Sequence, residues 1–328
     1  MKYGNTFLSG KFVLGPMAAY TDIAFRLLCR RNGAAMCFTE FSNANAIIRN
    51  VSATWQLMQT CKEELPVGIQ IFGPDAATMA HAVKMINEKV SCGELFASCI
   101  DLNFGCPSGS VIRAGAGSAL LRKPEKMKEI VEACVAASEI PITAKIRAGW
   151  SSDNTVPLAK LLENAGIAGI TVHWRTATEG RKRQVGWQGM HKLKEEISVP
   201  LIANGGASSP ELAVKLLAES GCDAVMISSG ALGNPGIFQQ ANALLSGKPL
   251  LSGKECPAIS WKEKIDSFAQ YVSLAEKYNL LSPKRLRLHA IEFVSFQPGV
   301  KGVRKKLNSA KSTEEIMKII QEFEPSVF

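Results

Sequence analysis

A thiol placed in a turn is the first feature of this sequence that suggests chemistry. In the segment DLNFGCPSGS (101–110), Cys106 lies between a glycine and a proline, directly after a short apolar run. A segment that only has to pack gains nothing from a thiol at that place. Lys145 and Arg147 end another apolar run, ITAKIR, and on a strand residues two apart point to one face. We therefore expect a reactive site built from several strand ends.

Other apolar runs also end in polar residues. Read along the chain, these are Gln70, Asp101, Asn103, Lys145, Arg147, His173, Asn204, Ser228 and Ser229. One such residue would be an ordinary satisfied cap or half of a structural ion pair. So many are hard to explain by packing, because each buried polar group left unpaired costs about 1–3 kcal/mol. A bound polar ligand would supply the partners.

Two glycine-rich turns follow the last two runs, NGGASS (204–209) and SSGALGNPG (228–236). Glycine lets backbone amides approach a ligand closely, and paired turns of this kind form the usual phosphate site of an α/β barrel. The alternative is two tight turns without a ligand. With a phosphate-bearing cofactor there, Gln70, Asn103 and Lys145 would face its ring. An ammonium group beside an electron-accepting ring stabilises developing negative charge, which suits a flavin.

Eight short β-rich runs occupy the first three quarters of the chain. They are FVLGPM (12–17), MCFTEF (36–41), VGIQIFG (67–73), CIDLNFG (99–105), ITAKIR (142–147), GITVHW (169–174), PLIANGG (200–206) and DAVMISSG (223–230). Helix-like segments such as SPELAVKLLAESG lie between most of them. This alternation predicts an α/β fold, a TIM (β/α)8 barrel. An open doubly wound sheet is the less favoured alternative, because no run ends in a GxGxxG turn.

A helical tail follows the barrel. The segment SGKPLLSGKECP (246–257) is rich in glycine, proline and lysine, which is typical of a linker. We therefore expect a catalytic barrel domain over residues 1–247, a linker over 248–257 and a small C-terminal helical domain over 258–328. Three or four helices are expected in the tail, with GVRKKLNSA (302–310) as a short turn.

Composition narrows the class of protein. The chain has 328 residues and a net charge of +9, which favours a polyanionic partner. Its nine cysteines show no paired spacing, which favours free thiols in a reducing cytoplasm and argues against structural zinc. The sequence has neither an uninterrupted apolar run of about 18 residues nor the apolar core of a signal peptide. We expect a cytoplasmic monomer with no metal and no membrane contact.

Several segments resemble the tRNA-dihydrouridine synthase family. The chain reads LGPMAAYTDIAFR at 14–26 and NFGCPSGSVIRAGAGSALLRKP at 103–124, followed by AKIRAGW, TVHWRT, IANGG and GALGNP. The resemblance covers the whole barrel and reaches the tail in LRLHAIEF and GVRKKLN. The NxGCP turn followed by GxGSALLR is highly specific, and AKIR and VHxRT on the next two runs support it.

The resemblance implies a TIM barrel that holds FMN, a small helical domain, NADPH (or NADH) as reductant and tRNA as substrate. In that family reduced FMN delivers a hydride to carbon 6 of a uracil, and the residue that Cys106 matches donates a proton to carbon 5 on the other face. A thiol suits this task, because its reference pKa of roughly 8.5 keeps it protonated at neutral pH yet able to release the proton.

The resemblance also assigns roles to individual residues. The expected catalytic residue is Cys106, and the expected cofactor-binding residues are Pro16, Met17, Ala18, Gln70, Asn103, Lys145, His173, Asn204, Gly205, Gly206, Ser229 and Gly230. Three motifs depart from the family pattern. NGD is replaced by NGG, ending at Gly206, and GRG is replaced by SSG, with Ser229 in place of arginine. The glycine after the histidine is replaced by Trp174. Without that arginine the phosphate has one charge-assisted hydrogen bond fewer, so we expect weaker flavin binding and an unchanged reaction type.

Basic residues gather in two places that could contact RNA. Residues 284–306 carry seven lysines and arginines against the single acid Glu292, and RTATEGRKRQVGW (175–187) carries four more. A solvated helix face is the plainer explanation of such a cluster. If both clusters border the barrel mouth, they would bind tRNA phosphates without reading sequence. The expected substrate-binding residues are Arg147, Arg175, Arg181, Arg183, Arg285, Arg287, Arg304 and Lys305.

Two other functions stay open at this point. A flavoenzyme of free pyrimidines, similar to dihydroorotate dehydrogenase, would share the barrel and the flavin but would not need a basic helical tail. An RNA-binding protein with a vestigial flavin site would explain Gly206 and Ser229. It would not explain why Cys106, Lys145 and His173 are present.

Overall fold

The computed structural model describes residues 1–179, 187–247, 260–295, 297 and 299–323. The expected linker, residues 248–257, together with Arg181 and Arg183, lies outside the described residues. Within the described part of the chain, no helix is both long enough and apolar enough to cross a membrane. In the same residues, no three side chains of the kinds that bind metals come together.

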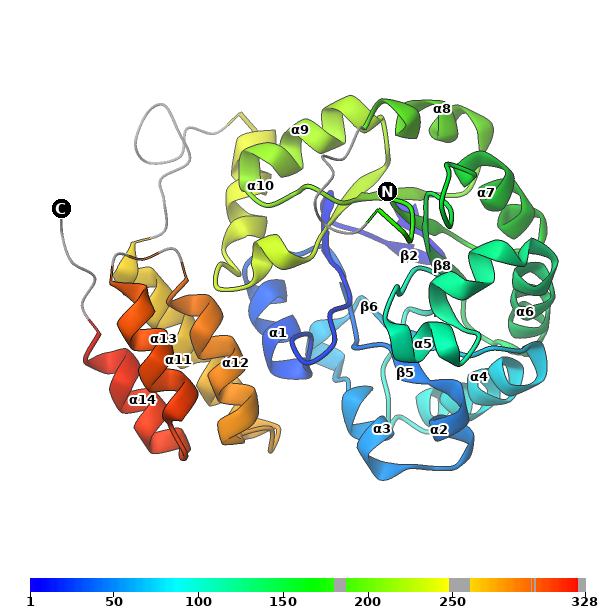
Figure 1. Cartoon of the computed structure of the whole chain (residues 1–328). Helices are drawn as coiled ribbons and strands as arrows, with labels where there is room; N and C mark the ends of the chain where they lie inside the picture. Colours follow the sequence, from blue (N-terminus) through cyan, green and yellow to red (C-terminus); the bar gives the residue numbers. More distant parts are fainter. Residues whose placement is uncertain (180–186, 248–259, 296, 298, 324–328) are drawn as a thin grey trace.

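Eight parallel strands close into a barrel, as the sequence predicts (Figure 1). The strands are β3 Phe12–Leu14, β4 Cys37–Phe38, β6 Val67–Phe72, β7 Cys99–Asn103, β8 Ile142–Arg147, β9 Ile170–His173, β10 Leu201–Asn204 and β11 Ala224–Ile227. The ring is closed because β3 pairs with β11 and β4 pairs with β6. The alternative of an open doubly wound sheet is therefore wrong. A further short strand, β5 Ser42–Asn43, pairs with the carboxyl end of β6.

A hairpin covers the end of the barrel at which the strands begin. It consists of β1 Lys2–Tyr3 and β2 Thr6–Phe7. Tyr3 is fully buried and packs edge-on against Phe38. A Cβ atom added at Gly169 would lie 2.5 Å from the Tyr3 ring, so this position has room only for glycine. The opposite end of the barrel, where the strands end, is the mouth at which barrel enzymes build their active sites.

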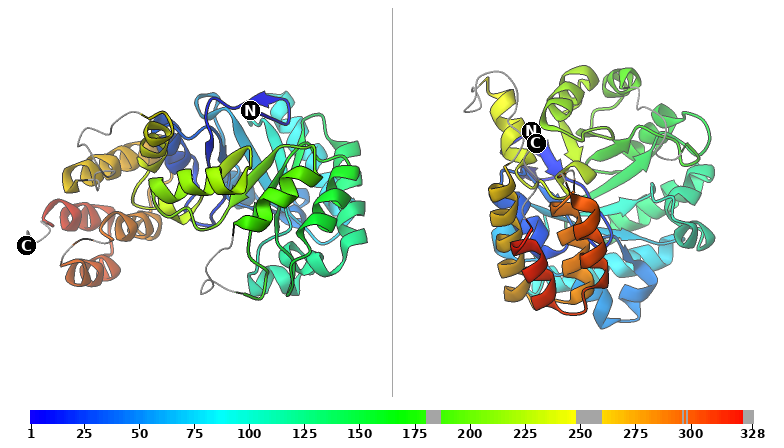
Figure 2. Two further views of the ribbon diagram at one scale, coloured as in Figure 1. Left: turned by 90° about the horizontal axis from the view of Figure 1, so that it is seen from above. Right: turned by 60° about the vertical axis from the view of Figure 1, so that its left-hand side comes forward.

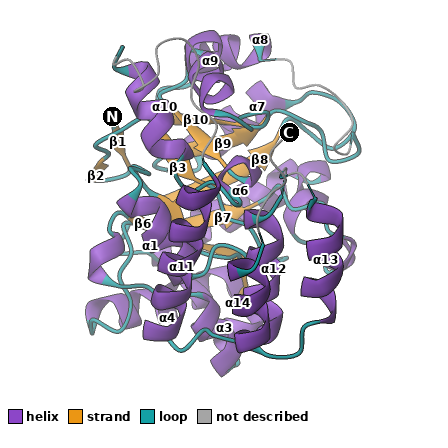
Figure 3. Ribbon diagram, turned by 90° about the vertical axis from the view of Figure 1, so that its left-hand side faces the viewer, coloured by secondary structure: helices purple, strands orange, loops and turns teal. Residues whose placement is uncertain are grey.

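Helices surround the strands (Figure 3). The long ones are α1 Ile23–Arg31, α4 Ala76–Ser91, α6 Pro124–Ala137, α7 Thr155–Asn164, α8 Gln188–Glu196, α9 Pro210–Ser220 and α10 Ile237–Leu245. Short helical segments lie in the connections: α2 Ala44–Ile48, α3 Ser52–Leu57, η1 Lys62–Glu64, α5 Gly109–Arg113, η2 Gly117–Arg122 and η3 Ser229–Ala231. Side chains of Asp22, Asp75 and Ser209 cap α1, α4 and α9, which explains where these helices begin.

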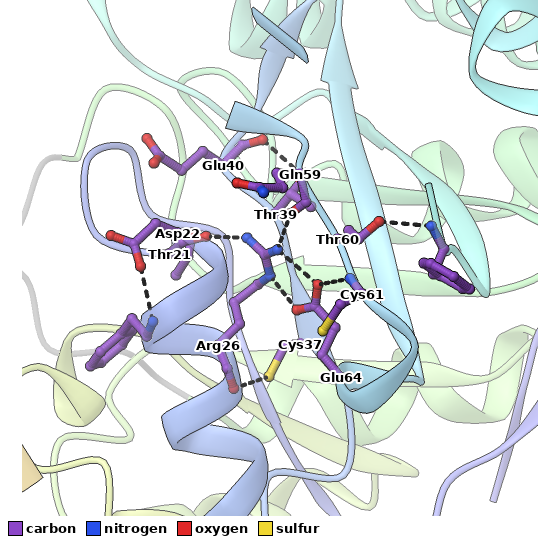
Figure 4. A network of polar contacts seen from close by, with 12 residues as sticks. Thr21, Asp22, Arg26, Cys37, Thr39, Glu40, Gln59, Thr60, Cys61 and Glu64 are labelled. Atoms are coloured by element: carbon purple, nitrogen blue, oxygen red, sulfur yellow. Dashed lines mark hydrogen bonds and ion pairs between the residues drawn. The ribbon is translucent and has the colours of Figure 1, made fainter. Parts of the chain in front are cut away.

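A buried ion pair ties α1 to the segment that leads into β6. Arg26 donates from Nε to Glu64 Oε2 at 2.7 Å, and both side chains are 0% exposed. The same guanidinium donates to the carbonyl oxygens of Thr21 and Gln59, each at 2.6 Å (Figure 4). All three guanidinium nitrogens of Arg26 are hydrogen-bonded, so the ion pair with Glu64 is tolerated in the core. Removal of either partner would leave an unpaired buried charge.

Within its described residues the tail has four helices, and they lie to one side of the barrel, beside α1 (Figures 1 and 2). They are α11 Trp261–Lys277, α12 Pro283–Phe293, α13 Val300–Ser309 and α14 Thr313–Gln321. The expectation of a short turn over residues 302–310 is wrong, because residues 302–309 lie in α13 and Ala310 directly follows it. Val303, Leu307 and Ala310 recur at helical spacing and are buried, so packing stabilises the helix despite Gly302.

Candidate active site

A chain of hydrogen bonds crosses the neighbouring strands β6, β7 and β8 and reaches the carboxyl end of β7 at Asn103. Asp101 accepts from Thr143 Oγ1 at 2.7 Å and from Gln70 Nε2 at 2.7 Å. Gln70 in turn accepts, through Oε1, from Asn103 Nδ2 at 2.8 Å. All four residues are buried, so each donor is matched to an acceptor without water. Burial raises the pKa of Asp101 to about 6, although the bonds from Gln70 and Thr143 lower it.

Asn103 holds the turn that carries the thiol. Its Oδ1 accepts from the backbone amides of Gly105 at 3.1 Å and Cys106 at 2.9 Å. The carbonyl oxygen of Cys106 accepts from the amide of Ser118 at 3.1 Å. The half-buried thiol therefore stands on a backbone that is fixed on both sides, and the orientation of Asn103 is set by Gln70.

A glycine opposite this turn makes the arrangement possible. Gly117 has φ +58°, and a Cβ atom there would lie 2.9 Å from the carbonyl oxygen of Cys106 and 2.7 Å from Val111. The left-handed backbone and the close approach both require glycine. The segment GxGSALLR in the sequence thus packs directly against the turn that holds Cys106.

Lys145 links β8 to β10 and β11. Its Nζ donates to Asn204 Oδ1 at 3.0 Å, and Asn204 Nδ2 donates to the carbonyl oxygen of Met226 at 2.8 Å. Burial, together with the nearby charge of Arg147, lowers the pKa of Lys145 to about 8. Asp101 and Cys106 oppose these effects, so the ammonium is still largely protonated at pH 7.

His173 and two arginines complete this side of the mouth. Burial lowers the pKa of His173 to about 2, and the charges of Lys145, Arg147 and Arg175 contribute, so the imidazole is neutral. Its buried Nε2 has no hydrogen-bond partner among the described residues. Arg147 donates from Nε to the carbonyl oxygen of Gly105 at 2.7 Å, which fastens it to the thiol turn. Buried Arg175 Nε likewise lacks a partner in the part of the chain described here.

The loop after β3 carries three of the predicted cofactor residues. Pro16 and Met17 are half-buried and Ala18 is exposed; all three follow the strand, which ends at Leu14 and so is shorter than expected. The backbone amide and carbonyl of Met17 bond to the hydroxyl of Thr21, at 3.0 and 3.1 Å. The loop therefore has a defined shape at the mouth.

The two glycine-rich turns pack against each other. Gly205 and Gly206 have φ of +112° and +86°. A Cβ atom at Gly230 would lie 2.5 Å from the carbonyl oxygen of Ala207. Ser229 begins η3 and is exposed. Trp187, which the sequence reasoning missed, donates from Nε1 to the carbonyl oxygen of Gly205 at 3.3 Å. A lone tryptophan ahead of a helix carries no signal that would have identified it.

The predicted substrate arginines of the tail are engaged within the protein. Arg285 donates from Nη1 to Asp22 Oδ2 at 2.9 Å. Arg287 bonds to the carbonyl oxygen of Ala310, and Arg304 Nη2 donates to Ser295 Oγ at 2.6 Å. By contrast, Lys305 is exposed on α13. A role of these residues in substrate binding stays a prediction, as does that of Arg181 and Arg183.

Comparison with known proteins decides the family. The family model described as dihydrouridine synthase matches residues 13–325, nearly the whole chain. The chain belongs to the dihydrouridine synthase family. It is 32% identical over 327 residues to tRNA-dihydrouridine synthase B of Pseudomonas aeruginosa, covering 98% of this chain and 95% of that protein. It is 40% identical over 247 residues to the protein of the same name from Vibrio parahaemolyticus, covering 75% of each.

More distant solved structures share the fold of this dihydrouridine synthase-family chain. The old yellow enzyme homologue from Zymomonas mobilis aligns with a TM-score of 0.51 at 11% identity, over 80% of this chain and 97% of that one. A 2-naphthoyl-CoA reductase complex aligns with a TM-score of 0.55 at 12% identity, over 76% of this chain and 52% of that one. Identities this low support the barrel fold alone. The resemblance to the dihydrouridine synthase family seen in the sequence is confirmed by the match to the family model.

Proposed function

We propose that this chain is an FMN-dependent tRNA-dihydrouridine synthase, which reduces a uridine of tRNA to 5,6-dihydrouridine with electrons from NADPH or NADH. The observation that carries the proposal is the turn of Cys106, fixed by Asn103 at the barrel mouth and flanked by the cationic Lys145 and Arg147. A thiol held in this way suits a proton donor, and its surroundings suit an electron-accepting ring.

The residues present fit a flavin mononucleotide. His173 Nε2 and Arg175 Nε are buried polar atoms without partners in the described residues, and a bound polar group would satisfy both. The amide chain of Gln70 and Asn103 and the ammonium of Lys145 would hold the ring, while Pro16, Met17 and Ala18 would contact it. The turns with Gly205, Gly206, Ser229 and Gly230 would bind the phosphate through backbone amides and a hydroxyl.

The bound flavin would supply the hydride that carbon 6 of the uracil receives. Cys106 holds the proton for carbon 5, and after its transfer the half-buried thiolate is close enough to solvent to regain one. Arg147 fastens the Cys106 turn through Gly105 and keeps it at the mouth. Addition of one hydride and one proton saturates the C5–C6 bond, and one NADPH is oxidised to NADP⁺ for each uridine reduced.

The tail would bind the RNA. We assign catalysis to residues 1–247 and tRNA binding to residues 258–328, helped by Arg175, Arg181 and Arg183. Exposed lysines on α13 and the net charge of +9 support this division. The target uridine would have to leave its stack to reach the mouth. A tRNA substrate also favours a cytoplasmic location.

The direct test uses the full-length protein, FMN, NADPH and an unmodified tRNA transcript. Mass spectrometry of the digested RNA should reveal dihydrouridine, formed in equal amounts to the NADPH consumed. Turnover of free uracil or orotate with no product in tRNA would favour the free-pyrimidine enzyme instead. Tight tRNA binding by a protein that shows no change in flavin fluorescence or melting temperature at saturating FMN would favour the vestigial site.

A further inference from the structure

The loop that carries Pro16, Met17 and Ala18 is hydrogen-bonded to the tail helices at the end where it leads into α1. Asp22 ends this loop and caps α1 by accepting from the amide of Phe25 at 2.9 Å. Its other oxygen accepts from Tyr271 of α11 at 3.1 Å and from Arg285 of α12 at 2.9 Å. The Asp22 side chain is 2% exposed, so these bonds form in a site of low dielectric. Burial opposes ionisation, but contacts with His289, Phe25 and Arg285 lower the pKa of Asp22 to about 2.

A second buried carboxylate holds the same loop from the barrel side. Glu40 follows β4, and its Oε2 accepts from the backbone amide of Ala19. Ala19 has φ +67°, a conformation that costs a residue with a side chain about 1–3 kcal/mol unless its surroundings enforce it. The other oxygen, Oε1, has no hydrogen-bond partner in the described chain and lies 4.0 Å from Arg285 Nη1. One guanidinium nitrogen therefore faces both carboxylates that shape the loop.

Two more residues of α12 face the loop at helical spacing. Arg285, His289 and Glu292 follow each other at intervals of four and three residues, so they share one face of the helix. Glu292 Oε1 accepts from the hydroxyl of Tyr20 at 3.2 Å. The buried ring of His289 stacks on Tyr271 with centroids 4.0 Å apart and lies 3.7 Å from Asp22 Oδ2. A continuous face of α12 thus meets residues 20–22.

The far side of this loop reaches the proposed cofactor site. Met17 is bonded to Thr21 through both its backbone groups, so residues 17–21 form one hydrogen-bonded turn. We propose that the tail positions this cofactor loop, with Arg285 as the positioning residue that acts through Asp22 and Glu40. This inference rests on the proposed function, because it concerns how the flavin site is held. The proposal gives the tail a role besides RNA binding. It also implies that tRNA bound to the tail can affect the shape of the barrel mouth.

The test compares Arg285→Gln with a matched control in the full-length protein. Lys277→Gln removes another ion pair between tail and barrel, Lys277 to Glu63 at 3.3 Å, which does not touch the loop. Arg285→Gln should raise the FMN dissociation constant on the order of tenfold, as removal of a charge-assisted hydrogen bond would. It should also speed amide exchange at Ala19 and Tyr20 in the flavin-free protein. Lys277→Gln should change neither the FMN dissociation constant nor amide exchange at Ala19 and Tyr20. Arg285→Lys keeps the positive charge, so both quantities should lie closer to the wild type than in Arg285→Gln.

The outcomes separate a positioning role from a structural one. If Arg285→Gln lowers the melting temperature but leaves FMN affinity and the exchange of Ala19 and Tyr20 unchanged, the proposal is overturned. If Arg285→Gln does not fold, Glu40→Gln decides by the same two measurements, since it removes the charge facing Arg285 and keeps an oxygen for Ala19. A wild-type protein that fails to bind FMN overturns the proposed function, while the exchange data still decide whether Arg285 holds the loop.

Discussion

Cys106 differs from most other described cysteines in the surroundings of its sulfur. Burial raises the pKa of the thiols of Cys29, Cys37, Cys99, Cys134 and Cys222, which lie in the core. Such thiols act as small apolar groups. Cys106 instead lies half-buried at the mouth, on a turn whose amide and carbonyl are both bonded. This placement supports the prediction that Cys106 acts on a ligand.

Cys106→Ala should separate the two halves of the reaction. Flavin binding and flavin reduction by NADPH should persist, because the thiol acts on the pyrimidine. Dihydrouridine formation should fall about 10²- to 10⁴-fold, as is typical when a general acid is removed. Stopped-flow absorbance and product analysis measure the two halves. Cys92→Ala, at an exposed cysteine just after α4, serves as the control, and full activity in Cys106→Ala would place the proton donor elsewhere.

Lys145 should leave a signature in the pH dependence of stability. Its pKa is about 8 in the folded protein against 10.5 for an unperturbed lysine, so between these values the unfolded chain binds more protons. Folding stability of the cofactor-free protein should therefore rise with pH from about 8 to 10.5 through this group. Urea unfolding across this range should show the rise in the wild type and in Lys128→Met. Its persistence in Lys145→Met would contradict the assignment.

The strand-end residues can be predicted from the sequence, but their hydrogen-bond partners cannot. Gln70, Asn103 and Lys145 were predictable, because polar groups at the ends of apolar runs stand out. Gln70 is oriented by Asp101, which in turn accepts a hydrogen bond from Thr143, forty-two residues after Asp101. No local sequence pattern indicates that Asp101 and Thr143 are partners. The same holds for Glu40, whose partner amide belongs to Ala19 on another loop. Long-range hydrogen bonds of this kind depend on how the closed barrel brings distant segments together. They cannot be predicted from the sequence until that three-dimensional arrangement is known.

At the scale of elements, the thiol turn and η2 form one unit. Gly117, the first residue of η2, approaches Cys106 so closely that no side chain fits between them. The barrel itself could be predicted, because the runs of β-forming residues alternate with helix-like segments. Helix α13 could not, since Gly299 and Gly302 indicate a turn locally and only tertiary packing of Val303 and Leu307 overrides that signal.

Gly117→Ala should damage both stability and activity. The left-handed backbone and the close approach to Cys106 together should cost about 1–3 kcal/mol in the free energy of unfolding. Gly93→Ala is the matched control, because Gly93 also has a positive φ of +78° but has nothing within 4 Å of an added Cβ. Denaturant unfolding and dihydrouridine assays should show lower stability in both variants and lower activity only in Gly117→Ala. Normal activity in Gly117→Ala would mean that the turn tolerates displacement.

At the scale of the whole molecule, charge is distributed to suit a polyanion. The chain carries 38 lysines and arginines against 29 acids, and α13 presents Lys301 and Lys305 on the face opposite its buried Val303 and Leu307. Arg285, Arg287 and Arg304, which a sequence count treats as equal to these lysines, are bonded within the protein. The structure thus distinguishes the exposed lysines of α13 from arginines that are bonded within the protein.

Neutralising the available lysines should weaken tRNA binding. In Lys301→Gln/Lys305→Gln/Lys306→Gln, the slope of log affinity against log salt should become shallower by roughly 0.7–0.9 for each phosphate that the lysines no longer neutralise. Flavin reduction by NADPH should be unchanged. The control removes the same charge from barrel helices, in Lys128→Gln/Lys160→Gln/Lys215→Gln. Filter binding at several salt concentrations would show equal slopes in both triple variants if α13 is only a solvated face.

The closure of the barrel also dictates when a newly made chain can become an enzyme. The Lys11 side chain, next to β3, bonds to the carbonyl oxygen of Asp223, 212 residues away, and Asp22 bonds to Arg285, 263 residues away. On the ribosome, β3 and α1 emerge long before these partners, so their apolar residues cannot be buried in the native way until the later segments have been made. A chain cut before α12 would contain every barrel strand yet leave the buried Asp22 without its cation. We therefore expect flavin to be loaded into the finished polypeptide, after release of nearly its whole length.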